Sequence, residues 1–158
     1  MNVFHTNSSS LFFQFDFSKN KLISKGILRE NMTEKELLDL HKVTLREFTS
    51  QQWSRNGFYD DINRIVYINA DLSSDERRKV LFHELGHLDH FRSLYQNAPL
   101  LCENEANRYM IQNLVAEEIA EYGVESFNSV RFMERYQLKT VTDEVMIQDE
   151  FYKQVSNM

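Results

Sequence analysis

The sequence contains very little cysteine, proline and glycine for its length, with one Cys, one Pro and four Gly in 158 residues. A single cysteine, Cys102, excludes an internal disulfide framework. The scarcity of proline and glycine leaves no interdomain linker and no low-complexity tract. We therefore expect one domain over residues 1–158, composed of a strand-like N-terminal segment (1–30), a core (31–123) and a helical C-terminal extension (124–158).

Long apolar runs and clusters of positive charge are also missing. No stretch approaches the ~18 apolar residues of a membrane-spanning helix, and the N-terminus lacks the charged and apolar regions of a signal peptide. The formal net charge is −6, without a long basic block. This argues against a nucleic-acid-binding surface, because such surfaces neutralise phosphates with Lys and Arg. We expect a cytoplasmic protein that contacts neither a membrane nor nucleic acid directly.

Apolar residues make up 42% of the chain, and their spacing predicts a small sheet early in the sequence. Residues 11–17 (LFFQFDF) alternate Phe with polar positions and predict a strand, and residues 57–69 (GFYDDINRIVYIN) predict a hairpin. Between them, Thr33 followed by Glu36 is a capping box that predicts a helix start. The expected apolar face of this helix consists of Leu37, His41, Leu45 and Phe48. Its apolar neighbours make His41 a partly buried core residue rather than a ligand.

The remaining elements are predicted to be helices. Ser73 and Glu76 form a second capping box at the start of a helix that contains Gly86. Glycine costs a helix roughly 1 kcal/mol relative to alanine, which indicates a close approach of another element at that point. A further helix is predicted to begin near Pro99 and to end at Gly123, followed by two short helices in the C-terminal extension. A small sheet followed by helices predicts an α+β fold.

The motif HELGHLDH, at positions 83–90, carries the strongest chemical signal. His83 and His87 are four residues apart, so on a helix they differ by about 40° in azimuth and can converge on one ion. Glu84 lies beside them and can act on a metal-bound water as a general base, as in other HExxH sites. A chance HExxH is expected on the order of once in a few hundred such sequences. We therefore predict one zinc ion per chain, held by His83 and His87, with Glu84 as the catalytic residue.

A catalytic zinc site needs a third protein ligand. The extended pattern HExxHxxGxxH is rejected, because it requires glycine and histidine where this chain has His90 and Ser93. A following helix offers Glu103 and Glu105 in the segment CENEAN, and only one can face the ion because they lie about 200° apart on a helix. We choose Glu103 over Glu105, because Asn107 lies one turn after Glu103 and can orient a ligand histidine.

Two neighbouring residues are assigned other roles. His90 lies ~10 Å along the axis from His83 in a straight helix, too far to share its ion. A solvent-exposed histidine is expected there, in preference to a supporting or substrate-side role. Cys102 differs from Glu103 by about 100° in azimuth, so we expect a small buried side chain rather than a ligand.

The segment of roughly residues 55–115, from the GFY…RIVYIN hairpin through ERRKVLFHELGH to ENEAN, resembles the ImmA/IrrE-type metallopeptidases of bacteria, phages and integrative elements. This resemblance implies a reduced thermolysin-like zincin with His83, His87 and Glu103 as ligands and Glu84 as base. Family members typically cleave a helix-turn-helix repressor encoded nearby, which makes such a repressor the expected partner. After ENEAN, RYMIQNLVAEE replaces the family's usual F-A…L-L-M-P run, so the wall on the substrate side departs from the family pattern.

Two functions are compatible with these observations. The favoured one is a zinc-dependent endopeptidase that cleaves a helix-turn-helix repressor and so derepresses phage, mobile-element or stress genes. The alternative is an antirepressor that binds and sequesters the repressor without cleaving it and whose metal is structural. Glu84 favours proteolysis, because a structural zinc needs no base and usually has four protein ligands.

The sequence leaves the substrate contacts open between several residues. The candidates for stabilising the oxyanion of the transition state are Tyr59, Tyr67, Tyr109 and His90. Residues 64–69 are expected to form a sheet edge that can pair with an extended peptide. The aromatic residues of the C-terminal extension are expected mainly to pack it onto the domain, and any exposed remainder, or residues 11–17, would dock the repressor.

Overall fold

In the computed structural model, the described part of the chain is residues 32–158, and the strand predicted for residues 11–17 lies outside it. The described strands form one sheet in the order β1-β3-β2. β1 (Thr44–Phe48) runs parallel to β3 (Ile65–Asn69), and β2 (Gly57–Asp60) runs antiparallel to β3. The helices are α1 (Glu34–His41), α2 (Ser74–Gly86), α3 (Arg92–Asn97), α4 (Pro99–Tyr122), the 3₁₀ turn η2 (Val124–Ser126), α5 (Ser129–Arg135) and α6 (Val141–Ser156).

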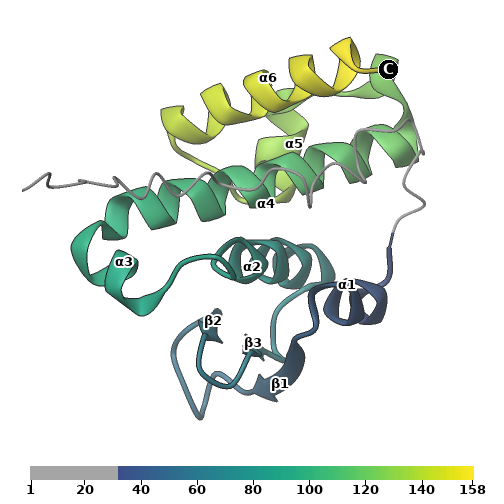
Figure 1. The fold of residues 1–158 in the computed structure, drawn as a ribbon. Coiled ribbons are helices and arrows are strands. Elements are labelled where there is room, and N and C mark those ends of the chain that lie inside the picture. The colour runs from purple at the N-terminus through teal and green to yellow at the C-terminus, as the bar shows by residue number, and fades with distance from the viewer. Residues whose placement is uncertain (1–31) are drawn as a thin grey trace, which may run out of the picture.

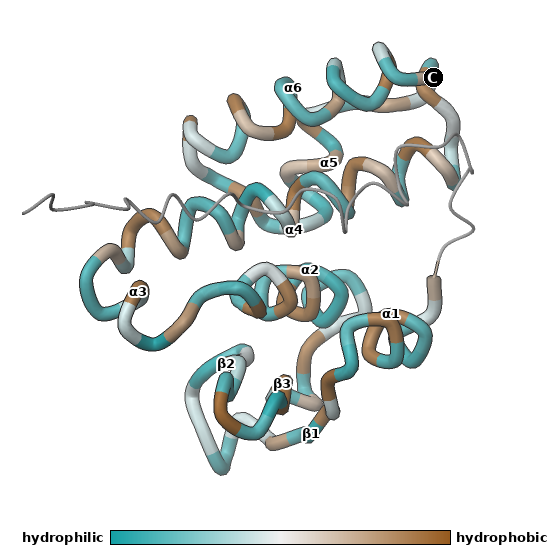
Figure 2. The backbone as a smooth tube through the Cα atoms, viewed as in Figure 1, coloured by the Kyte–Doolittle hydropathy of each residue, from teal (hydrophilic) through white to brown (hydrophobic). Residues whose placement is uncertain are grey.

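These elements stack in layers around α2 and α4. The sheet covers one side of α2, α4 crosses its other side, and α6 packs on the side of α4 that faces away from α2 (Figure 1). Hydrophobic and hydrophilic segments alternate along α4 in Figure 2, as expected for a helix that is covered on two sides. The predicted α+β fold, with a small sheet followed by helices, is confirmed. Within residues 32–158, no helix has both the length and the apolar character needed to cross a bilayer.

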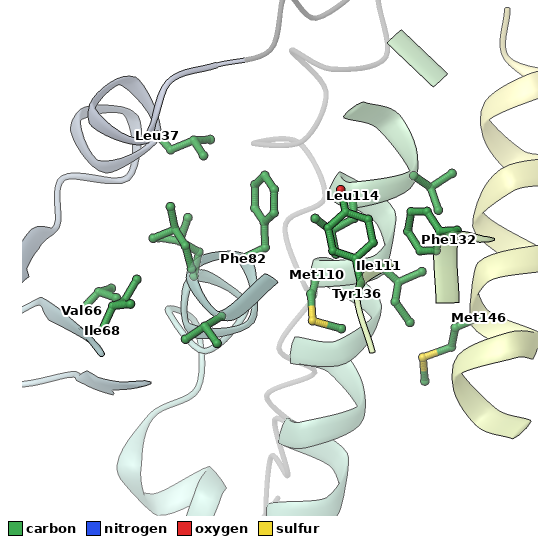
Figure 3. Close-up of a cluster of buried hydrophobic side chains, with 14 of the residues drawn as sticks. Leu37, Val66, Ile68, Phe82, Met110, Ile111, Leu114, Phe132, Tyr136 and Met146 are labelled. Carbon is green, nitrogen blue, oxygen red and sulfur yellow. The ribbon is translucent and has the colours of Figure 1, made fainter. Parts of the chain in front are cut away.

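The hydrophobic core extends through all of these layers. Val66 and Ile68 of β3 are fully buried against α2, and in Figure 3 the buried Phe82 ring of α2 lies between Leu37 of α1 and Leu114 of α4. Beyond α4, Phe132 lies between α4 and α6 (Figure 3), and both Phe132 and Ile147 are fully buried. One continuous core therefore joins the sheet to the C-terminal helices.

Local signals place the helix starts correctly. Thr33 caps α1 and Ser73 caps α2, each in a complete capping box, as predicted. The predicted extension of α1 through Leu45 and Phe48 is wrong, because the helix ends at Lys42 in the left-handed conformation (φ 54°). The residues that follow form β1, whose backbone pairs with β3 about 21 positions later in the chain. His41 is partly buried, as expected, and its ring Nε2 lies 3.0 Å from the Tyr109 hydroxyl.

Gly86 lies where α2 crosses α4, which confirms the predicted close approach. A Cβ atom at this position would lie 2.7 Å from the Cα and 3.0 Å from the carbonyl oxygen of Ala106. Both contacts are with backbone atoms, so the clash can be relieved only by moving one helix away from the other. Glycine at this position therefore lets α2 and α4 pack at the spacing that the site described below requires.

We expect the overpacking in Gly86→Ala to cost about 1–3 kcal/mol. The gain of ~1 kcal/mol in helix propensity offsets part of this cost, so the free energy of unfolding should fall by up to about 2 kcal/mol. Chemical denaturation measures the change, with Gly86→Ser expected to destabilise at least as much. An alanine variant as stable as the wild type would show that the two helices can separate without cost.

The C-terminal extension is part of the core rather than a free arm. Phe132 and Tyr136 are buried, and Phe127 stacks on Phe151 with ring centroids 4.4 Å apart. Of the five aromatic residues in 124–158, only Tyr152 is exposed, at 65% of its surface. The expectation that most of these side chains pack the extension onto the domain is confirmed. The two helices predicted there are α5 and α6, although α6, with 16 residues, is not short.

Candidate metal centre

Helices α2 and α4 bring three metal-ligating side chains together. The Nε2 atoms of His83 and His87 lie 3.1 Å apart. One oxygen of the Glu103 carboxylate lies 3.4 Å from Nε2 of His83, and the other lies 3.6 Å from Nε2 of His87. Among residues 32–158, this is the one group of three or more such side chains that can hold a metal ion.

The donor geometry fits a tetrahedrally coordinated ion. Ligand atoms at ~2.0–2.2 Å from a tetrahedral zinc are separated from each other by roughly 3.3–3.6 Å. The Nε2–Nε2 separation of 3.1 Å is close to this range, and the Glu103 carboxylate lies 3.4 and 3.6 Å from the two histidines through different oxygens. With one donor atom per residue, the three donors lie within 4.8 Å of one another. Two imidazoles and one carboxylate are the donor set of known catalytic zinc sites. An ion held by these three residues would keep a fourth position for water or substrate.

The electrostatic setting keeps both histidines in the form that a metal requires. Burial lowers the pKa of His83, and burial together with the neighbouring His83 lowers the pKa of His87. Both imidazoles are therefore neutral near pH 7 and can offer a lone pair. The Asn107 side chain hydrogen-bonds His83, as expected from its position one turn after Glu103.

Glu84 is adjacent to His83 in the sequence but is not one of the three converging side chains. It is 7% exposed and accepts a hydrogen bond from the backbone N–H of Tyr59 in β2. Burial, and then the negative charge of Glu103, raise the pKa of Glu84 to about 8, whereas Arg55 acts in the opposite direction. Burial and the charge of Glu103 both disfavour a negative charge on Glu84. A cation bound near Glu103 would counteract this effect and favour the Glu84 carboxylate, the form that a general base needs.

His90 is buried, so the expectation of a solvent-exposed histidine is wrong. The reason is that α2 ends at Gly86, with His87 as its C-cap, and the chain then turns. The backbone N–H of His90 donates to the carbonyl of His87 at 2.9 Å, which folds the His90 ring back against the His87 ring. Glu105 hydrogen-bonds His90 instead of joining the three converging side chains. Cys102 is fully buried, as predicted.

One residue at the site was missed by the sequence reasoning. The Tyr95 hydroxyl donates a hydrogen bond to Glu103, and the Tyr95 ring lies 5.8 Å from the ring of His87. Tyr95 belongs to the short helix α3, and no motif in the sequence marks it. Tyr95 is 42% exposed, so a substrate can reach its side chain.

The other candidates for stabilising an oxyanion lie in different places. Tyr67 stacks on Phe58 with ring centroids 4.4 Å apart, on the face of the sheet that points away from α2. Tyr109 contacts His41 through its hydroxyl, and His90 is engaged with other side chains of the site. Tyr59, on the same face of β2 as Gly57, is directed toward α2 and is half-buried.

The expected sheet edge at residues 64–69 is also wrong, because β3 is the central strand and pairs on both sides. Among the strands of residues 32–158, β1 and β2 are the outer ones instead. The Tyr59 backbone N–H points away from β3 and reaches Glu84. A Cβ at Gly57 would lie 3.4 Å from the Glu84 carboxylate. The outer side of β2 in the described sheet therefore borders the candidate site.

Comparison with known families gives one match. The model of the Peptidase_M78 family, described as the IrrE N-terminal-like domain, matches residues 38–148. The match includes the sheet, α2 and α4, and it extends through α5 into α6, well beyond the roughly 55–115 that show the resemblance in the sequence. No curated protein and no solved structure matches the chain significantly.

Proposed function

The chain belongs to the Peptidase_M78 family, and from this premise we propose that it is a zinc-dependent endopeptidase with His83, His87 and Glu103 as metal ligands. The family supports a metallopeptidase-type function in general. The observation that carries the specific proposal is the position of Glu84, a buried carboxyl group next to three converging ligands but not one of them. A purely structural site has no use for such a group.

When bound, a divalent ion acts as a Lewis acid, which lowers the pKa of a coordinated water and polarises the substrate carbonyl. Glu84 accepts a proton from the attacking water and passes it to the leaving amine. The Tyr59 N–H holds the Glu84 carboxylate in place during both transfers. Tyr95 is our candidate donor for the developing oxyanion, because it is 42% exposed beside the ligand Glu103; its single O–H, which donates to Glu103 here, would turn to the substrate oxygen.

An extended peptide is the substrate form that suits this arrangement. A segment that adds to the outer side of β2, where none of residues 32–158 pairs, would gain backbone hydrogen bonds and lie next to Glu84. Antiparallel pairing along Gly57–Asp60 would align several residues of the peptide on either side of the scissile bond. We therefore assign the substrate-binding edge to β2, in place of residues 64–69.

The proposed substrate is a helix-turn-helix repressor protein whose cleavage derepresses phage, mobile-element or stress genes. The support for this step is the resemblance to the ImmA/IrrE-type peptidases, together with the net charge of −6, which does not suit DNA binding by the chain itself. Sequestration of the repressor without cleavage is the competing account. The two accounts differ in whether a new peptide terminus appears.

The decisive experiment incubates the purified chain with the helix-turn-helix protein encoded beside it, with and without a chelator, and measures intact masses. We expect two complementary fragments that appear only when metal is present and reappear when Zn²⁺ is restored. An intact repressor in a stable complex with the chain would support sequestration instead. Cleavage that is unaffected by the chelator would contradict the proposed metal dependence.

A further inference from the structure

We propose that His90 and Glu105 form a hydrogen-bonded relay that fixes the orientation and the tautomer of the ligand His87. This inference rests on the proposed metal site and assigns positioning roles to two residues outside the ligand set. His90 was expected at the surface and Glu105 was the rejected alternative to Glu103. The structure joins them into one chain of contacts that ends at a ligand.

The relay consists of two short contacts in series. Nδ1 of His87, the ring nitrogen that does not face the other ligands, lies 3.0 Å from Nδ1 of His90. Nε2 of His90 lies 2.8 Å from a carboxylate oxygen of Glu105. The His90 side chain is only 2% exposed, so water does not compete effectively for either nitrogen. Glu105 is 39% exposed and links this buried ring to the surface.

Only one arrangement of protons satisfies both contacts and metal binding together. The Glu105 carboxylate accepts, so Nε2 of His90 must carry a proton and donate it. A neutral His90 then has a lone pair at Nδ1, which accepts the N–H of Nδ1 of His87. A neutral His87 protonated at Nδ1 has its lone pair at Nε2, the atom that faces His83 and Glu103. The charge on Glu105 thus selects the tautomer of His87 that can bind a metal.

The local fold explains why the relay forms here. Because α2 ends at Gly86, the turn at residues 87–90 brings the His90 ring over the outer nitrogen of His87. Glu105 is two residues after Glu103 and points in another direction from α4, which is where His90 lies. Asn107 supports His83 from the same helix. Each ligand histidine is therefore supported by a residue of α4: His83 directly by Asn107, and His87 by Glu105 through His90.

Metal affinity tests the relay without any need for cleavage. Outer hydrogen-bond partners of ligand histidines typically contribute 10–100-fold to metal affinity. We expect His90→Ala to weaken Zn²⁺ binding by about 10–100-fold in chelator competition. His90→Asn should restore most of the loss, because its side-chain oxygen can accept from His87 near the position of Nδ1. Glu105→Ala should weaken binding as well, and because Glu105 is partly exposed, this variant is expected to fold like the wild type.

Asp89→Asn is the matched control for charge. Asp89 lies beside His90 in the sequence and is exposed, so its substitution removes a nearby negative charge without breaking either contact. We expect its Zn²⁺ affinity to stay within about 3-fold of the wild type, well below the effect of losing an outer hydrogen bond. Nitrogen-detected NMR of the Zn²⁺-loaded wild type should show His87 protonated at Nδ1 and His90 protonated at Nε2.

The outcomes separate this inference from the proposed function. Wild-type Zn²⁺ affinity in both His90→Ala and Glu105→Ala, or the opposite tautomer for His90, would overturn the relay while leaving the metal site intact. An effect of Asp89→Asn equal to that of Glu105→Ala would also overturn it, because charge alone would then explain the loss. A wild-type chain that binds no Zn²⁺ would overturn both the relay and the proposed function.

Discussion

Glu84→Gln is expected to abolish peptide cleavage while the fold and the metal content stay unchanged. The amide keeps the size of the side chain and can still accept the Tyr59 N–H, but it cannot take a proton from the attacking water. General base catalysis typically contributes 10²–10⁴-fold, so the rate should fall by at least about that factor. Fragment formation by mass spectrometry, together with metal analysis of the same sample, measures both properties.

The stability of the metal-free variant gives an independent check on the setting of Glu84. Burial raises the pKa of Glu84 from the ordinary 4.5 to about 8. Between pH 4.5 and 8, Glu84 is therefore protonated in the folded chain but ionised in the unfolded chain. The wild type therefore loses stability from this group as the pH rises from 4.5 to 8. Glu84→Gln removes that loss and should be at least as stable as the wild type at pH 8.

His83→Ala is the matched control for the loss of cleavage. It removes a ligand rather than the base, so it should lose both bound metal and cleavage, whereas Glu84→Gln loses cleavage alone. Cleavage by Glu84→Gln at a rate near that of the wild type would leave Glu84 without its assigned role. Stoichiometric metal in His83→Ala would contradict the ligand assignment.

Features that depend on neighbouring residues could be predicted from the sequence. The capping boxes at Thr33 and Ser73 use side chains three residues apart, and the structure reproduces both. The convergence of His83 and His87 follows from helical periodicity alone. Glu103 could be chosen because Asn107 shares its helix face, although this choice also required α2 and α4 to meet at the correct register.

Features that depend on distant parts of the chain could not be predicted. Leu45 and Phe48 fit a helical face, yet they lie in a strand because pairing with β3 outweighs the local pattern. The position of His90 depends on where α2 ends, and a straight helix was the wrong assumption. Tyr95 reaches Glu103 only because the short α3 turns back toward α4 (Figure 1). The edge position of β2 likewise follows from the strand order.

The C-terminal extension contributes buried side chains to the core, so it cannot be removed without disturbing the fold. Removing residues after Gly123 would test docking only if the shorter chain stayed folded, and the burial of Phe132 and Ile147 against α4 argues that it would not. α6 also carries buried Glu150, which accepts from Arg108 of α4 at 2.8 Å. A point substitution therefore tests the role of this extension better than a truncation.

We expect Phe132→Ala to lower the free energy of unfolding by about 3–5 kcal/mol, the usual cost of emptying a buried aromatic site. Phe132 is fully buried, and its ring lies 4.9 Å from Tyr136 and 5.6 Å from Phe127. Such a loss is a large fraction of the 5–15 kcal/mol that typically separates folded from unfolded domains. Chemical denaturation of the metal-free chain measures it.

Tyr152→Ala is the matched control, because Tyr152 lies in the same extension but is 65% exposed. Its loss should change stability by no more than about 0.5 kcal/mol. If Tyr152→Ala left stability and Zn²⁺ binding intact but reduced cleavage of the repressor, this one exposed aromatic would mark a docking contact. A negligible effect of Phe132→Ala on unfolding would instead show that α5 and α6 are dispensable to the core, and the extension would again be a candidate arm for binding the substrate.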